Sequence, residues 1–243
     1  MRKMELICIP YAGGSVFSYE KWRGLLNPGV ELCLFELAGR GTRSQEPLYQ
    51  NLHEAVDDIY ACMNERFNIM ETPFALFGYS MGSLIAYELA HKIKELLGQN
   101  PQHIFFAAKQ PPDYTSNNKI LHTLPMQELI NELTAMGGTP SEVFQDPMLR
   151  DYYLPIIKSD LRITENYRYI QRESKLNCDI TTIDGIYDHM LKSPIEGWQK
   201  HSNLECYTYK LEGDHFFIHT HTNQLLNIVN RQLTKNIHPE NLI

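Results

Sequence analysis

Residues 78–82 read Gly78-Tyr79-Ser80-Met81-Gly82, and they stand between the apolar run 74–77 and the amphipathic segment 83–97. This is the G-x-S-x-G pattern, placed between an expected strand and an expected helix. A sharp turn there exposes the serine hydroxyl above the sheet edge, and it needs glycine on both sides because a Cβ would meet neighbouring backbone. The stretch therefore predicts an α/β fold in which Ser80 is a nucleophile at a helix N-terminus.

The rest of the sequence alternates short apolar runs with amphipathic segments, which predicts a mostly parallel, doubly wound sheet covered by helices on both faces. The length of 243 residues, with 43% apolar and 21% charged residues, indicates one globular domain over residues 1–243. We expect strands at 6–10, 32–36, 74–78, 103–108, 179–183 and 206–211, and helices at 52–67, 83–97 and 223–233.

Residues 115–170 interrupt this alternation, because they contain helical patterns at 126–136 and from 151 onward to 172 but no convincing strand. An insertion of this size must lie outside the sheet, and in doubly wound folds it often covers the carboxyl edge of the strands. We therefore expect a helical lid, with Gly137-Gly138 as a flexible joint. The alternative is a helical ornament with no role in access to the site.

A serine becomes a strong nucleophile only when a base takes its proton and a third group orients that base. His215 follows the last expected strand, where hydrolases of this type carry the base. The acid should follow the strand 179–183, where Asp184 and Asp188 compete. We favour Asp188, since it lies on the loop tip, whereas Asp184 at the strand end is placed to bond local backbone.

The tetrahedral oxyanion of an acyl transfer requires two preorganised N–H donors. One is the backbone N–H of Met81, directly after the nucleophile. The loop 10–14, Pro-Tyr-Ala-Gly-Gly, follows the first strand, and Ala12 is our choice for the second donor. Its two glycines could instead form an ordinary turn or half of a phosphate loop. No G-x-G-x-x-G or G-K-[ST] motif accompanies them, which argues against a nucleotide site.

Other function classes fit less well. The net charge of −7 disfavours nucleic-acid binding, and the apolar run 6–9 is too short for a signal peptide or a membrane span. Five scattered cysteines, most of them in apolar runs, indicate reduced core thiols of a cytoplasmic protein. His215, His219 and His221 are spaced closely enough for a metal, but no Glu-x-x-His or cysteine partner accompanies them, so we expect none.

Two stretches are more restrictive than the serine motif: Pro-Tyr-Ala-Gly-Gly at 10–14 and Gly-Arg-Gly-Thr-Arg at 39–43. Together with the serine motif and with Gly-Asp-His-Phe-Phe at 213–217, they resemble the stand-alone, type II thioesterases that accompany nonribosomal peptide and polyketide synthetases. The resemblance runs in order over about residues 5–232. It implies an α/β-hydrolase with a helical lid, a catalytic triad of Ser80, Asp188 and His215, and no cofactor, since the substrate itself carries the phosphopantetheine arm.

The resemblance further implies hydrolysis of aberrant or stalled acyl groups on acyl or peptidyl carrier proteins of an assembly line, by a cytoplasmic monomer with no nucleic-acid or membrane partner. Tyr79 and Lys109 depart from the family pattern and could alter which acyl groups are accepted. Because carrier proteins are generally acidic, Arg40, Arg43, Lys109 and Lys119 are candidate docking residues.

Three other functions remain open at this point. A carboxylesterase or lipase acting on free oxygen esters would share the same triad. A chain-releasing thioesterase cut from a larger synthetase would have a similar sequence, although a start at Met1, a few residues before the first strand, favours an independent protein. A non-enzymatic binding protein would be expected to lack a triad residue, and all three are present.

Overall fold

The computed structural model describes residues 3–114, 119–190 and 195–237. Six strands form one sheet in the order β2-β1-β3-β4-β5-β6, and every pairing is parallel. This arrangement confirms the predicted α/β fold with a mostly parallel sheet. The strands are β1 (Met4–Ile9), β2 (Val30–Cys33), β3 (Phe74–Tyr79), β4 (His103–Ala107), β5 (Asp179–Gly185) and β6 (Cys206–Leu211).

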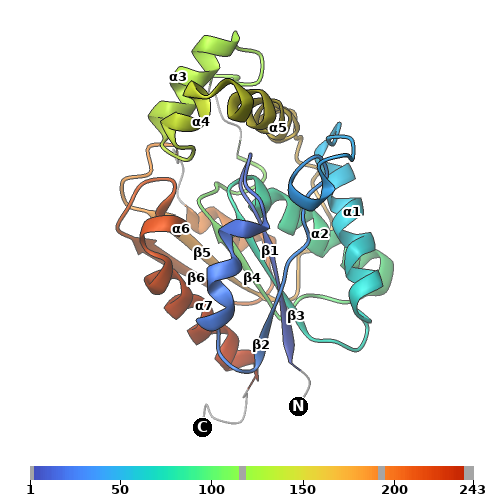
Figure 1. The fold of residues 1–243 in the computed structure, drawn as a ribbon. Helices are drawn as coiled ribbons and strands as arrows, with labels where there is room; N and C mark the ends of the chain where they lie inside the picture. Colours follow the sequence, from blue (N-terminus) through green and yellow to red (C-terminus); the bar gives the residue numbers. More distant parts are fainter. Residues whose placement is uncertain (1–2, 115–118, 191–194, 238–243) are drawn as a thin grey trace.

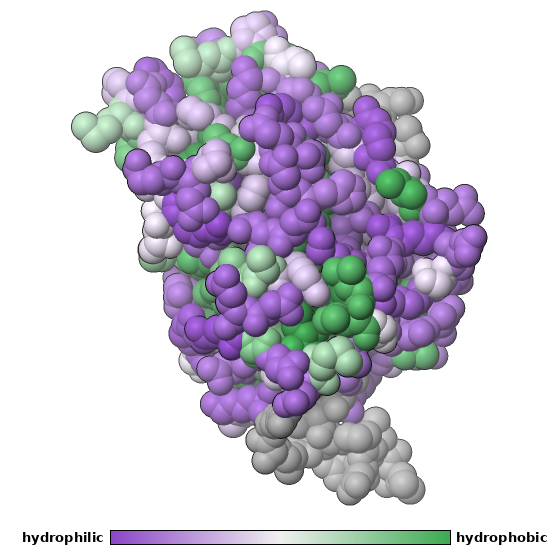
Figure 2. Space-filling view, turned by 90° about the vertical axis from the view of Figure 1, so that its right-hand side faces the viewer, coloured by the Kyte–Doolittle hydropathy of each residue, from purple (hydrophilic) through white to green (hydrophobic). Residues whose placement is uncertain are grey.

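Helices cover both faces of the sheet (Figure 1). Helices α1 (Leu52–Arg66) and α2 (Met81–Leu97) pack on one face, and α7 (Thr222–Ile237) packs on the other with the short α6 (Phe217–Thr220). Each face has its own apolar cluster, so the central strands β3 and β4 are buried on both sides, whereas the edge strand β6 is partly exposed. Figure 2 views the molecule from the side of α1 and shows a mostly hydrophilic surface, as expected of a helix that buries only one stripe.

The lid segment forms three helices above the carboxyl edge of the strands, at the top of Figure 1. They are α3 (Met126–Met136), α4 (Ser141–Gln145) and α5 (Pro147–Glu165), with a small apolar cluster of their own. Residues 115–118 of the predicted range 115–170 lie outside the described residues. The lid therefore adds a third layer at the edge of the sheet where ligands of doubly wound folds bind.

Several predicted boundaries were wrong. Strand β2 covers 30–33 rather than 32–36, since its pairing with β1 joins Met4 to Val30 and Ile7 to Cys33. Helix α5 starts four residues before the predicted position 151 and ends at Glu165 rather than 172. Its start is fixed by the Asp146 carboxylate, which accepts hydrogen bonds from the N–H groups of Met148 and Leu149.

All five cysteines are free thiols in the structure. Cys8, Cys33 and Cys178 are buried as predicted, but Cys62 and Cys206 are only partly buried, so the expectation of five core thiols was wrong for these two. Among the described residues, no helix is both long and apolar enough to cross a membrane.

Candidate active site

Ser80 lies at the turn between β3 and α2, in a backbone conformation that non-glycine residues rarely adopt (φ 51°, ψ −112°). Its N–H donates to the carbonyl of Ala107 on the neighbouring strand β4 at 2.8 Å. A Cβ at Gly78 would lie 2.3 Å from the carbonyl oxygen of Gly82, and a Cβ at Gly82 would lie 2.1 Å from that of Ile9. The two glycines are therefore required by close backbone approach, as the G-x-S-x-G pattern indicated.

The histidine predicted as the base lies directly beside this serine. The distance from His215 Nε2 to Ser80 Oγ is 3.1 Å, and the distance from His215 Nδ1 to Asp188 Oδ2 is 2.7 Å. In the tautomer with the proton on Nδ1, His215 donates to the carboxylate and accepts from the serine hydroxyl. His215 and Asp188 are 6% and 8% exposed, so their hydrogen bond is buried, whereas the bond to the more exposed Ser80 is only partly buried.

The loops after β5 and β6 bring these two residues together. The N–H of Tyr187 donates to the carbonyl of Gly213 at 3.0 Å, so backbone hydrogen bonding continues past the ends of the strands. A Cβ at Gly185 would lie 2.4 Å from the carbonyl oxygen of Asp214, so glycine permits this close approach. Asp188 then turns back, and its second carboxylate oxygen accepts from the N–H of Met190 at 2.9 Å.

The competing acids lie elsewhere. Asp184 is within β5, whereas Asp188 is the residue that contacts His215. Asp214 accepts a hydrogen bond from the N–H of Phe216 at 2.8 Å, as expected of an aspartate that caps a turn. The geometry thus brings together the nucleophile, base and acid that the sequence favoured.

The two predicted oxyanion donors come from two different elements. Met81 begins α2, and the loop that contains Ala12 follows β1 and approaches the start of α2 at Gly82. Among the hydrogen bonds of the described residues, neither the Met81 N–H nor the Ala12 N–H has an acceptor. Two N–H groups without a partner beside a nucleophile have the character of an oxyanion hole.

Tyr79 has a different role from the one predicted. Its side chain is fully buried, and its hydroxyl donates to the carbonyl of His215 at 2.7 Å and accepts from the N–H of Ile218 at 3.3 Å. Burial raises the pKa of this hydroxyl well above its usual value, so it remains a donor. Tyr79 therefore supports the histidine loop rather than contacting the acyl group, a role that its position beside Ser80 did not reveal.

His219, in the histidine cluster, has a side-chain partner from the loop after β1. His219 Nε2 lies 2.9 Å from the hydroxyl of Tyr11, and burial lowers the pKa of its imidazole. Among residues 3–114, 119–190 and 195–237, no group of three or more His, Cys, Asp or Glu side chains is placed to hold a metal ion.

Two of the four candidate docking residues have little surface available. Arg40 is 2% exposed and its guanidinium is paired with Asp160, so the prediction that it docks a partner was wrong. Arg43 is engaged by Glu46 and Asp58. The docking prediction failed because the sequence shows that an arginine is charged but not which side chains pair with it in the fold.

The other two cations differ from each other. Lys109 follows β4 at the edge of the sheet that carries Ser80, and burial lowers the pKa of its ammonium to about 8. Lys119 is exposed and forms an ion pair with Glu132 at 2.8 Å. Lys109 is thus a partly buried cation at the sheet edge rather than one on an open surface.

Sequence comparison agrees with this geometry. The sequence profile of the thioesterase domain matches residues 4–233. The chain belongs to the thioesterase family. It is 33% identical over 232 residues to "Linear gramicidin dehydrogenase LgrE" of Brevibacillus parabrevis, covering 94% of this chain and 87% of that protein. It is 32% identical over 218 residues to "S-acyl fatty acid synthase thioesterase, medium chain" of Rattus norvegicus, covering 88% and 81%.

Structural comparison gives the same result. ClbQ, from the colibactin nonribosomal peptide/polyketide synthetase pathway, superimposes with a TM-score of 0.91 at 35% identity, covering 96% of this chain and 98% of ClbQ. The thioesterase described here is therefore a hydrolase of acyl thioesters with the α/β-hydrolase fold. The dehydrogenase name of one relative has no counterpart in this sequence, which contains no G-x-G-x-x-G dinucleotide motif.

Proposed function

We propose that this thioesterase is a stand-alone, type II enzyme that removes aberrant or stalled acyl groups from carrier proteins of a nonribosomal peptide or polyketide assembly line. The observation that carries the proposal is the Ser80–His215–Asp188 array in a chain that matches ClbQ along nearly its whole length. The partners would be acyl or peptidyl carrier proteins. We propose that the enzyme acts as a cytoplasmic monomer, in keeping with its free thiols.

In the proposed mechanism, the Ser80 hydroxyl attacks the thioester carbonyl while His215 Nε2 takes its proton. The oxyanion of the tetrahedral intermediate accepts hydrogen bonds from the N–H groups of Ala12 and Met81. As the C–S bond breaks, the protonated His215 gives its proton to the departing pantetheine sulfur, which leaves as the thiol. A water molecule, deprotonated by the same imidazole, attacks the acyl-serine and releases the acid, while Asp188 holds the imidazole in one tautomer throughout.

This sequence of steps uses side chains and backbone of the chain itself. The phosphopantetheine arm belongs to the substrate, so the proposal includes no cofactor. The acyl group would bind beneath the lid, at the edge of the sheet where the partly buried Lys109 follows β4.

The substrate class is tested by comparing one short acyl group as a carrier thioester and as an oxygen ester, and then by comparing it with a full-length peptide on the carrier. We expect kcat/KM for a phosphopantetheinyl carrier thioester to exceed that for the p-nitrophenyl oxygen ester by about tenfold or more, since only the former offers the arm and the carrier surface. A preference for the oxygen ester would favour the carboxylesterase alternative. A carrier thioester of a full-length peptide, if preferred over a short acyl group, would favour chain release.

We also propose that α3 and α4 form the moving part of the lid, while α5 is its fixed part. Helix α5 is anchored to the main core through Ile163 and to the loop after β1 through Asp160. The buried apolar residues of α3 and α4 belong, among the described residues, to the small lid cluster, and Gly138 lies against the ring of Phe216, next to His215. Elements with few contacts to the core open more readily.

Hydrogen exchange tests this division of the lid. We expect α3 and α4 to exchange faster than the second half of α5 and the strands. A carrier protein loaded with a non-hydrolysable acyl analogue should slow the exchange of α3 and α4, because the bound arm would hold the lid closed. Equal protection in all three helices, unchanged by the loaded carrier, would contradict a gating role.

A further inference from the structure

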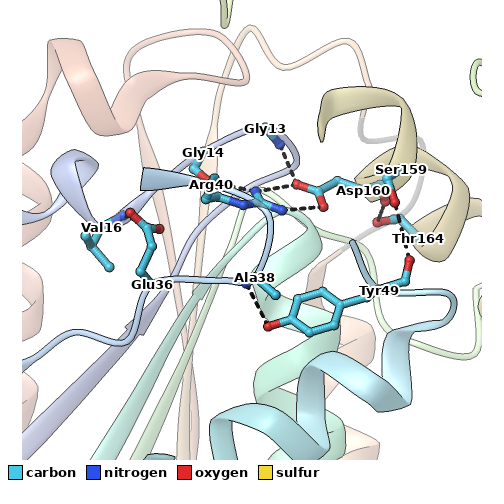
Figure 3. A network of polar contacts seen from close by, with 10 residues as sticks. All are labelled: Gly13, Gly14, Val16, Glu36, Ala38, Arg40, Tyr49, Ser159, Asp160 and Thr164. Atoms are coloured by element: carbon cyan, nitrogen blue, oxygen red, sulfur yellow. Dashed lines mark hydrogen bonds and ion pairs between the residues drawn. The ribbon is translucent and has the colours of Figure 1, made fainter. Parts of the chain in front are cut away.

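A buried ion pair contacts the loop after β1 at Gly13 and Gly14 (Figure 3). Arg40, from the loop after β2, donates from Nη1 to Asp160 Oδ2 at 2.6 Å and from Nη2 to Oδ1 at 2.7 Å. The two side chains are only 3% and 2% exposed. Asp160 belongs to α5, so this bidentate contact joins the lid to the body of the enzyme.

Both partners also hold the loop that contains Ala12. Asp160 Oδ2 accepts a hydrogen bond from the N–H of Gly13 at 2.8 Å. Arg40 Nη1 donates to the carbonyl of Gly14 at 2.9 Å. The remaining backbone hydrogen bond of this loop, from the Gly14 N–H to the Tyr11 carbonyl at 2.9 Å, closes the turn around Ala12.

This loop has a particular need for external support. Gly13 has φ 79°, and a Cβ there would lie 2.5 Å from Ile157 on α5, so this position requires glycine. The most flexible residue type therefore lies next to Ala12, whose N–H has to be positioned accurately. An oxyanion donor must be preorganised, because misplacement of a catalytic group by about 1 Å can cost about a hundredfold in rate. The turn bond fixes the Tyr11–Ala12 peptide unit relative to Gly14, so the direction of the Ala12 N–H in the site depends on what holds residues 13 and 14.

We propose that the Arg40–Asp160 pair is a positioning device for the oxyanion hole. It fixes the peptide units after Ala12 and so directs the Ala12 N–H at the developing oxyanion. Since Asp160 lies on α5, the donor is in place only while α5 is seated. The inference rests on the proposed function, because it takes Ala12 as a donor.

Energetics favour a geometric role over a stabilising one. A buried ion pair loses most of its Coulombic gain to desolvation, and apolar replacement of both partners often leaves stability unchanged. The chain contains a second pair of similar character, Arg172–Glu88, with Nη2 and Oε2 2.6 Å apart. That pair joins α2 to the segment after α5 and makes no contact with residues 10–14 among the described hydrogen bonds. It therefore serves as the matched control.

The test replaces both charges together, as Arg40→Met/Asp160→Leu, so that no unpaired charge is buried. The substrate is an acyl-N-acetylcysteamine thioester, which does not depend on a carrier protein. We expect kcat to fall about 10- to 100-fold with KM changed less than about threefold, since the donor acts mainly on the transition state. The control Glu88→Leu/Arg172→Met should retain kcat within about twofold.

Inhibitor binding separates positioning from general damage. A trifluoromethyl ketone analogue places an oxyanion in the hole when Ser80 adds to it, whereas the matched thioether does not. In the Arg40→Met/Asp160→Leu variant, affinity for the ketone should fall by the same factor as kcat, and affinity for the thioether should change less than about twofold. If this variant does not fold, Asp160→Asn carries the same comparison.

Three outcomes would contradict the inference in different ways. Unchanged kcat and ketone affinity in the folded variant would exclude positioning by the pair. Equal losses of ketone and thioether affinity would show a structural role only. If the wild-type enzyme binds the ketone no better than the thioether, the proposed oxyanion donors themselves are contradicted. If it hydrolyses the small thioester but not carrier-bound thioesters, only the proposed substrate class is contradicted.

Discussion

Replacement of Ser80 by alanine is expected to lower thioester turnover by about 10⁴-fold or more, because no other group in the proposed mechanism can form the acyl-enzyme. The fold should survive this change. Alanine removes one hydroxyl group whose only described partner is His215 Nε2. Turnover of an acyl-N-acetylcysteamine thioester measures the loss of activity, and the thermal unfolding midpoint of the same variant measures whether the fold survives.

A fluorophosphonate probe extends this test from rate to chemistry. It should label the wild-type enzyme once, at Ser80, and should leave the Ser80→Ala variant unlabelled. Ser44→Ala replaces an exposed serine in the loop after β2 and serves as the control, with labelling and turnover unchanged. Full activity in Ser80→Ala would end the serine-hydrolase mechanism.

Much of the fold could be predicted because its signals are local. The strand β6 and the helix α3 have the boundaries that the apolar patterns indicated, since turn residues or glycine end each of them. The serine turn could be predicted equally well, because its two glycines are required by backbone contacts within the motif and with the neighbouring strand. The order of serine, acid and histidine then restricted the remaining choices.

The contacts that the sequence did not predict join residues that are distant in sequence. Arg40 and Asp160 are 120 residues apart, and an arginine beside glycines gives no sign that it will be buried. The bond from the Tyr79 hydroxyl to the His215 carbonyl spans 136 residues. Hydrophobic periodicity gives the faces of helices and strands, but it does not identify which polar groups meet across the sheet edge.

The sequence also presents two candidate acids, Asp184 and Asp188, and the geometry now makes the choice between them testable. Asp188→Asn is expected to lower kcat by about 10⁴-fold, because an amide in place of the carboxylate favours the wrong tautomer of His215 and does not stabilise its protonated form. Asp188 accepts from His215 Nδ1 at 2.7 Å, and the Asn side chain retains the size to fill the same space. Stability should therefore change little relative to activity.

Asp184→Asn provides the matched comparison, since it is the same chemical change four residues earlier. Asp184 is 6% exposed and lies within β5 opposite Lys210 of β6, so its replacement should act on the unfolding midpoint and lower kcat less than about tenfold. Turnover and thermal unfolding of the two variants, measured at one pH, rank the acids directly. A larger loss of kcat for Asp184→Asn than for Asp188→Asn would move the acid to Asp184. Both residues are buried carboxylates, one in β5 and one in the loop after it. The residue that orients the base is therefore the one whose replacement lowers kcat strongly while the unfolding midpoint changes little.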